Sequence, residues 1–140
     1  MTHIAVLDDD PSTLGTIDEL AIERGWTVAA SSDPVDFFAS VEERRPDVLV
    51  VDVSPHVPPP PRNILDELQE NPATRQVPLV ISSFDRYALL DAQALLGSRL
   101  HCVLVKPFDA HDFLRCIEDA ILLTAGESGT AGANLCPTVS

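Results

Sequence analysis

Three acidic side chains and one lysine follow short apolar runs at separate places in the chain. They are Asp8 and Asp9 after residues 3–7, Asp52 after residues 48–51, and Lys106 after residues 102–105. Unbroken apolar runs rich in β-branched residues are typical of strands buried on both faces of a parallel sheet. Because ligands gather at the carboxyl ends of such strands, we expect these four side chains to meet at one rim.

The residue types in this set point to phosphoryl chemistry. A cluster of carboxylates repels itself unless a cation joins it, and oxygen ligands without thiolates or paired histidines favour Mg²⁺ over Zn²⁺. A carboxylate can also attack phosphorus, and a lysine supplies a point charge for a phosphoryl oxygen. Ser82 and Ser83, after a fourth apolar run, offer a hydroxyl to the same group. The set predicts Mg²⁺-assisted phosphoryl transfer to Asp52.

Apolar runs alternate with helical patterns along the chain, which indicates how the rim is built. Strands are expected over residues 3–7, 26–30, 48–52, 79–81 and 102–105. Helices are expected over residues 11–24, 34–45, about 64–68, 87–96 and from 109 to beyond 121. Five strands alternating with five helices predict an α/β fold with a doubly wound sheet of five parallel strands in the order 2-1-3-4-5.

The chain divides into one domain and a tail. Residues 1–123 have the length of a typical single domain. Residues 124–140 are rich in Gly, Ala, Ser and Thr and show no periodicity, so a flexible C-terminal tail is predicted. The prolines of the segment 55–61 cannot join a helix or a central strand, and they predict a stiff loop.

Composition excludes several classes of protein. The formal net charge of −13 argues against a nucleic-acid partner and favours a basic protein surface. No apolar run is long enough to span a bilayer, and the first residues lack a secretion signal. The odd set Cys102, Cys116 and Cys136 shows no metal-ligand spacing and is expected to be reduced. We therefore predict a cytoplasmic protein without membrane contact.

Three short motifs, taken with their order and spacing, resemble the receiver domain of two-component response regulators. They are Leu-Asp-Asp-Asp-Pro at 7–11, Pro-Asp-Val-Leu-Val-Val-Asp at 46–52, and Lys-Pro-Phe at 106–108. The resemblance covers about residues 3–123 and implies the flavodoxin-like (βα)5 receiver fold. It also implies a single-domain response regulator of a phosphorelay, which signals by phosphorylation-dependent protein contact and is not an enzyme, apart from slow autodephosphorylation.

The resemblance implies a role for each rim residue. Asp52 would be the phosphoacceptor, taking its phosphoryl group from a sensor histidine kinase or a phosphotransfer protein. Asp9, assisted by Asp8, would bind Mg²⁺ together with Asp52 and the main-chain carbonyl of Ser54. Lys106 would contact the phosphoryl group, and the bond from Lys106 to Pro107 is expected to be cis.

Two serines compete for the role of the switch hydroxyl that contacts the phosphoryl group. Counting from Asp52 favours Ser82, and counting from Pro78 favours Ser83. The residue after the hydroxyl is usually small in the family that the chain resembles, because it lies against the phosphoryl group. Ser83 meets this condition after Ser82, whereas Phe84 does not meet it after Ser83. Ser82 is therefore the predicted hydroxyl and Ser83 the alternate.

Departures from the family pattern favour a second hypothesis, a receiver-like interaction module that works without phosphorylation. The loop after Asp52 carries Pro55-His56 and a proline run, and Val103 stands where the family usually has an aromatic residue. A third hypothesis, a phosphatase of the haloacid dehalogenase type, would use the Asp-x-Asp of residues 8–10 but leaves Asp52 unexplained. A homodimer through the fourth helix is kept as an alternative to a monomer.

Overall fold

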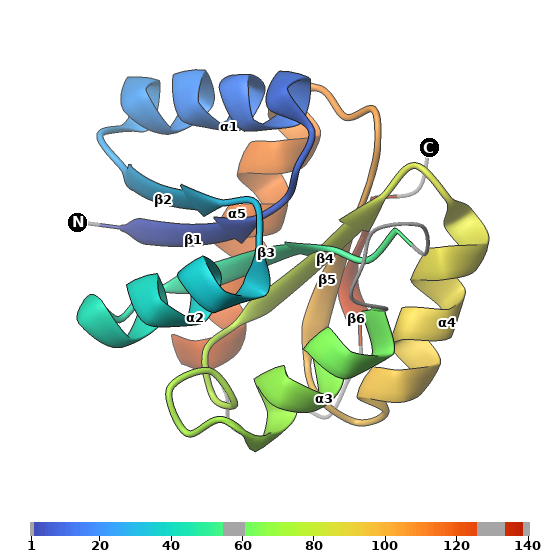
Figure 1. The fold of residues 1–140 in the computed structure, drawn as a ribbon. Coiled ribbons are helices and arrows are strands. Elements are labelled where there is room, and N and C mark those ends of the chain that lie inside the picture. The colour runs from blue at the N-terminus through green and yellow to red at the C-terminus, as the bar shows by residue number, and fades with distance from the viewer. Residues whose placement is uncertain (1, 55–60, 126–133, 139–140) are drawn as a thin grey trace.

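The computed structural model describes residues 2–54, 61–125 and 134–138, which form a parallel sheet with helices on both faces (Figure 1). The strands are β1 (His3–Leu7), β2 (Thr27–Ser31), β3 (Val48–Asp52), β4 (Leu79–Ser83), β5 (His101–Val105) and β6 (Asn134–Thr138). The helices are α1 (Pro11–Arg24), α2 (Pro34–Glu43), α3 (Pro61–Glu70), α4 (Arg86–Leu96) and α5 (Ala110–Ala125).

The sheet has the order β2-β1-β3-β4-β5-β6, and neighbouring strands pair in parallel. The predicted order 2-1-3-4-5 for the first five strands is confirmed. Strands β1, β3, β4 and β5 are buried over almost their whole length, as their unbroken apolar runs predict. The carboxyl ends of these strands therefore lie side by side at one edge of the sheet.

Strand β6 is a difference from the prediction of a flexible tail over residues 124–140. Its backbone pairs with β5 at the edge of the sheet, with a register irregularity between His101 and Val103. The sequence does not indicate this strand, because the strand is only five residues long and contains Pro137. A proline cannot donate a hydrogen bond to a ladder, but an edge strand has one open side on which the missing donor is tolerated.

Three aspartates begin helices next to the carboxyl rim. Asp10 caps α1, where its carboxylate accepts hydrogen bonds from the Ser12 amide and the Thr13 hydroxyl. Asp33 caps α2 and Asp85 caps α4 in the same way. A carboxylate at this position satisfies amides that have no partner within the helix and complements the helix dipole. The caps fix where each helix leaves the rim.

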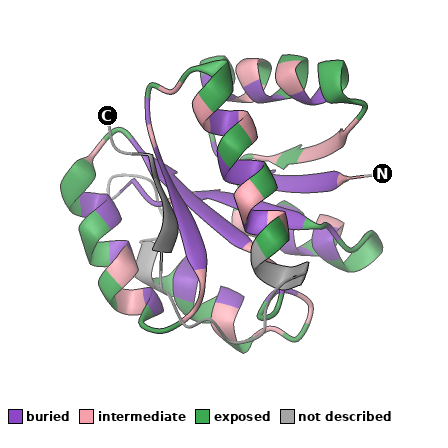
Figure 2. Cartoon of the chain, turned by 180° about the vertical axis from the view of Figure 1, so that it is seen from behind, coloured by how far each residue is buried: buried purple, intermediate pink, exposed green. Residues whose placement is uncertain are grey.

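The core consists of two apolar layers, one on each face of the sheet (Figure 2). Helices α2, α3 and α4 cover one face, with Phe37, Leu68 and Leu89 packed against Ile81 and Val103 of the sheet. Helices α1 and α5 cover the other face, where their apolar side chains meet the alternate residues of the same strands. This second layer includes Ile17, Phe113, Ile117, Val50, Val80 and Leu104. Alternating strand residues therefore belong to different layers.

Two further predictions of the sequence analysis concern the proline loop and membrane spans. Residues 55–60 of the predicted proline loop lie outside the described residues, and Pro61 begins α3. Among the described residues, no helix combines the length and the apolar character that crossing a bilayer requires.

Candidate functional site

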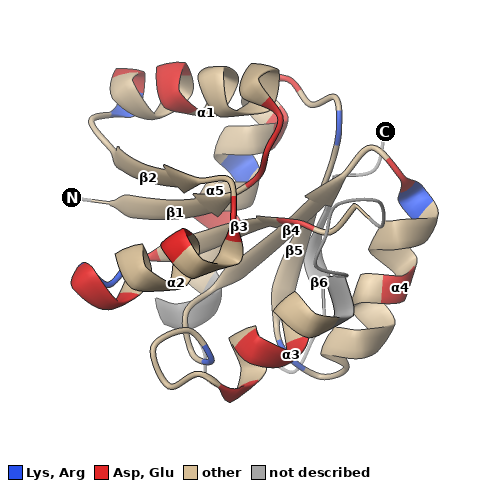
Figure 3. Cartoon of the chain, viewed as in Figure 1, with Lys and Arg blue, Asp and Glu red and all other residues tan. Residues whose placement is uncertain are grey.

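The acidic segment after β1, the acidic end of β3 and the basic segment after β5 lie along the same edge of the sheet (Figure 3). Asp8 directly follows β1, Asp52 ends β3, and Lys106 directly follows β5. The pairing register aligns Asp52 with Ser82 on the neighbouring strand β4. The predicted convergence of these side chains from separate strands is therefore a consequence of the parallel sheet order.

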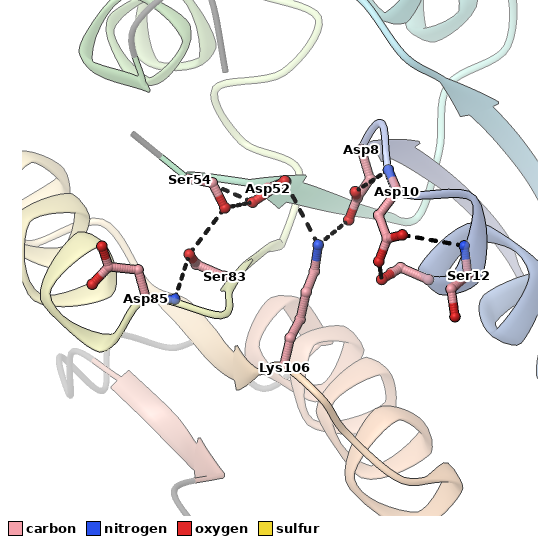
Figure 4. A network of polar contacts seen from close by, with 9 residues as sticks. Asp8, Asp10, Ser12, Asp52, Ser54, Ser83, Asp85 and Lys106 are labelled. Atoms are coloured by element: carbon pink, nitrogen blue, oxygen red, sulfur yellow. Dashed lines mark hydrogen bonds and ion pairs between the residues drawn. The ribbon is translucent and has the colours of Figure 1, made fainter. Parts of the chain in front are cut away.

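Lys106 contacts two of the carboxylates (Figure 4). Its Nζ lies 2.6 Å from Asp8 Oδ2 and 3.6 Å from Asp52 Oδ2. The side chains of Lys106 and Asp8 are each only 1% exposed, so this ion pair is shielded from water. The peptide bond from Lys106 to Pro107 is cis. The single lysine of the chain is thus held against the predicted phosphoacceptor.

The three acids form a group that fits a small divalent cation. Asp8, Asp9 and Asp52 each offer a carboxylate oxygen, and these oxygens lie within 4.8 Å of one another. Asp9 is exposed, whereas burial raises the pKa of Asp8, although the hydrogen bond from Lys106 opposes this rise. Hard oxygen ligands with one open side suit Mg²⁺. The main-chain carbonyl of Ser54 stays a predicted fourth ligand.

The two oxygens of Asp52 have different environments. Oδ1 accepts hydrogen bonds from the Ser54 amide at 3.0 Å and from the Ser54 hydroxyl at 2.7 Å. Oδ2 lies on the side of Lys106. These contacts fix the carboxylate in one orientation and leave Oδ2 as the oxygen that faces the lysine.

Of the two serines that were predicted as the switch hydroxyl and its alternate, Ser83 is the one with hydrogen bonds toward the site. The Ser83 hydroxyl lies 3.1 Å from the Ser54 hydroxyl and accepts a hydrogen bond from the Asp85 amide at 2.9 Å. It is therefore connected to Asp52 through Ser54 (Figure 4). Ser82 is also buried, but its hydroxyl has no hydrogen-bond partner among the described residues.

Strand alternation places the two serines on opposite faces of the sheet. Successive side chains of β4 point to opposite faces of the sheet. Ser83 shares a face with Ile81, on the side of α3 and α4, whereas Ser82 shares a face with Val80, on the side of α1 and α5. The register pairs Asp52 with Ser82, and the link from Ser83 to Asp52 runs instead through Ser54, which lies beyond the end of β3.

Two contributions of the site were not found from the sequence. The side chain of Ser54 holds Asp52, whereas only the Ser54 carbonyl was predicted to take part. Phe84 places its ring over Lys106, with 5.2 Å between Nζ and the ring centroid. The signal for Phe84 was present in the sequence, because a bulky residue stood where a small one is usual.

Comparison with known proteins places this fold among receiver domains. No protein-family model matches the sequence, and no curated protein matches it. Among solved structures, the chemotaxis response regulator CheY4 of Vibrio cholerae is 18% identical, with a TM-score of 0.72 over 86% of this chain and 98% of that one. A response regulator receiver domain from Clostridium thermocellum is 23% identical, with a TM-score of 0.70 over 89% and 98% of the two chains.

A third similar structure is the receiver domain of a sensor histidine kinase from Pseudomonas aeruginosa, which holds a coordinated magnesium ion in its active-site cleft. It is 22% identical, with a TM-score of 0.70 over 86% of this chain and 97% of that one. At these identities the likeness concerns the fold. The chain adopts the fold of response regulator receiver domains over most of its length.

Proposed function

We propose that the chain is a phosphorylation switch in which Asp52 accepts a phosphoryl group from a phosphohistidine on a sensor histidine kinase or a phosphotransfer protein. The single observation that carries this proposal is the position of Asp52 Oδ2. It faces the Lys106 ammonium at 3.6 Å and belongs to the same group of carboxylates as Asp8 and Asp9. This arrangement supports Asp52 as the nucleophile, Lys106 as its counter-charge and the carboxylates as metal ligands.

In the proposed transfer, one bond to phosphorus forms as another breaks. Asp52 Oδ2 forms a bond to phosphorus while the bond from phosphorus to the donor imidazole nitrogen breaks, and the imidazole leaves with that electron pair and takes up a proton. Asp8, Asp9, Asp52 and the Ser54 carbonyl would hold Mg²⁺, which when bound supplies positive charge to the phosphoryl oxygens. Lys106 adds its fixed charge to one of them.

Ser83 connects the site to a helix. Its hydroxyl now accepts a hydrogen bond from the Asp85 amide, and Asp85 caps α4. A phosphoryl group on Asp52 gives this hydroxyl a charged acceptor, and charge-assisted hydrogen bonds are stronger than neutral ones. Movement of Ser83 toward Asp52 would release the Asp85 amide and bias the start of α4. The output is then a change of protein-binding surface.

Intact-mass spectrometry of the full chain after treatment with acetyl phosphate and Mg²⁺ tests the proposal. We expect one added phosphoryl group, which requires the metal and is lost in Asp52→Asn. The exposed Asp91 provides the matched control, so Asp91→Asn should be phosphorylated like the wild type. An adduct that persists in Asp52→Asn, or no adduct in the wild type, contradicts the proposal and favours an interaction module that works without phosphorylation.

A further inference from the structure

Phe84 is an exposed aromatic residue beside the proposed phosphorylation site. It directly follows β4, and 58% of its surface is exposed. Tyr87 and Leu90 follow at intervals of three residues and are also exposed. The ring of Phe84 lies over the Lys106 ammonium, at 5.2 Å from Nζ to the ring centroid. A cation over an aromatic face is attracted by the ring quadrupole.

The ring helps to complete the surroundings of an ammonium that water does not reach. Asp8 and Asp52 contact Nζ from the carboxylate side, and the ring of Phe84 covers another side. The Lys106 side chain is 1% exposed although it stands at the start of a loop. Lysine is strongly hydrated and is seldom fully buried. The ring therefore stands where solvent would otherwise meet the ammonium.

Hydrogen bonds on both sides of Phe84 fix its backbone. The Ser83 carbonyl accepts from the Lys106 amide at 3.0 Å, and the Ser83 hydroxyl accepts from the Asp85 amide at 2.9 Å. The Asp85 carboxylate then accepts from the first amides of α4. With its backbone held in this way, the ring leaves Lys106 only if its side chain rotates or if Ser83 and Asp85 separate.

We propose that Phe84 is a lid on Lys106 that limits the access of phosphodonors and of water to Asp52. This inference rests on the proposed function of Asp52. With acetyl phosphate, Asp52 forms its bond to phosphorus as the bond to the acetate oxygen breaks, and acetate leaves with the electron pair. In hydrolysis, a water oxygen bonds to phosphorus, the Asp52 carboxylate leaves, and the water releases a proton. In this proposal, both reactants reach Asp52 past the ring.

Three variants of the full chain separate a lid from a merely apolar surface. Phe84→Ala removes the ring, Phe84→Tyr keeps an aromatic face, and Tyr87→Ala removes a neighbouring exposed ring as the matched control. In Phe84→Ala we expect Asp52 phosphorylation by acetyl phosphate, and later loss of the phosphoryl group, each to be about threefold faster, which matches one cation–π contact at a partly exposed site. Phe84→Tyr and Tyr87→Ala should retain wild-type rates.

A second readout does not depend on phosphorylation. Lys106 is the only lysine, so lysine-selective ¹⁵N labelling gives a single ammonium signal in a nuclear magnetic resonance spectrum. Its protons should exchange with water about threefold faster in Phe84→Ala than in the wild type, Phe84→Tyr or Tyr87→Ala. This measurement reports directly on whether the ring shields the ammonium.

The outcomes distinguish the lid from the proposed function. Unchanged or slower reactions in Phe84→Ala, or equal effects in Tyr87→Ala, overturn the lid while phosphorylation of the wild type upholds the role of Asp52. Faster phosphorylation without faster ammonium exchange also overturns it, because the ring would then act elsewhere. A wild type that accepts no phosphoryl group overturns the proposed function, and the access role of Phe84 with it.

Discussion

Strand β5 has a cation just beyond each end, and the two cations are neutralised in different ways. Lys106 follows β5 and meets the carboxylates of Asp8 and Asp52. Arg99 precedes β5, and its guanidinium donates hydrogen bonds to three main-chain carbonyls. These are the carbonyls of Leu68 at 3.2 Å, Thr74 at 2.8 Å and Val77 at 2.9 Å. One cation is matched by charges and the other by dipoles.

This difference separates a reactive end of the sheet from a structural one. Carboxylates can bind a metal, accept a phosphoryl group or change protonation, so the charge balance around Lys106 can change. Carbonyls do none of these, and the planar guanidinium of Arg99 suits several fixed acceptors at once. Burial lowers the pKa of Arg99 to about 10. Arg99 therefore ties the end of α3 and the segment before β4 to β5.

The largest expected effect is the loss of phosphorylation in Lys106→Met. Removing one preorganised cation from a site of developing charge should slow acetyl phosphate-driven phosphorylation of Asp52 by about 100-fold or more. Arg99→Met is the matched control at the other end of β5, and its rate per folded molecule should equal that of the wild type. Circular dichroism gives the folded fraction for both variants. Equal losses of rate would remove the distinction between the two ends.

The next effect in size is a loss of stability, which we expect at the Arg99 end of β5. Arg99→Met leaves three carbonyls without their charged donor, so the free energy of unfolding should fall by about 3 kcal/mol. Arg99→Lys keeps the charge but loses the planar set of donors. Its free energy of unfolding should lie between the values for the wild type and Arg99→Met. Urea unfolding of the three proteins measures these differences. If Arg99→Met were as stable as the wild type, the contacts of Arg99 with the carbonyls would not contribute to the free energy of unfolding.

The two ends of β5 were not equally predictable from the sequence. The reactive end follows from a general rule, because apolar runs locate the strands and polar residues at their ends must share a rim. Asp8, Asp52 and Lys106 were found in this way. Arg99 gives no such signal, since its partners are main-chain carbonyls that every residue carries. Only the folded chain shows that a carbonyl of α3 and two carbonyls of the segment before β4 converge on Arg99.

At the rim, a shift of one residue separates the two candidate hydroxyls. The period of a strand is two, so Ser82 and Ser83 are nearly equivalent in sequence but point to opposite layers.

Strand β6 was missed because a short segment with Pro137 and a flexible composition matches a tail better than a strand. Its place depends on pairing with β5, which local sequence does not encode.

Ser82 and Ser83 provide the next prediction, within the reactive end alone. Ser83→Ala removes a hydrogen-bond donor near Asp52 and should slow phosphorylation about fivefold to tenfold, the equivalent of one good hydrogen bond. Ser82→Ala removes a buried hydroxyl that has no partner among the described residues, so its rate should not change. Its free energy of unfolding should stay the same or rise by up to about 1 kcal/mol. The opposite pattern of rates would identify Ser82 as the switch hydroxyl.

The smallest expected effect is a pH dependence at the structural end of β5. His101 Nε2 lies 3.2 Å from the Gln93 amide nitrogen, a donor, so the neutral ring accepts there and donates from Nδ1 to the Arg99 carbonyl at 2.8 Å. Burial, aided by the charge of Arg99, lowers the pKa of His101. The unfolded chain therefore binds this proton more readily than the folded one.

Stability from a neutral His101 is consequently complete above the unfolded pKa of about 6.5 and is lost as the pH falls through that value toward the lower folded pKa. Urea unfolding between about pH 7.5 and about pH 5.5 should show a decline that is shallower in His101→Gln. Burial also lowers the pKa of His3, so His3 should account for part of the decline that remains in His101→Gln. The exposed His111 is the matched control, and His111→Gln should retain the full decline. An equally steep decline in His101→Gln would mean that the acid sensitivity of the fold arises outside the Arg99 end of β5.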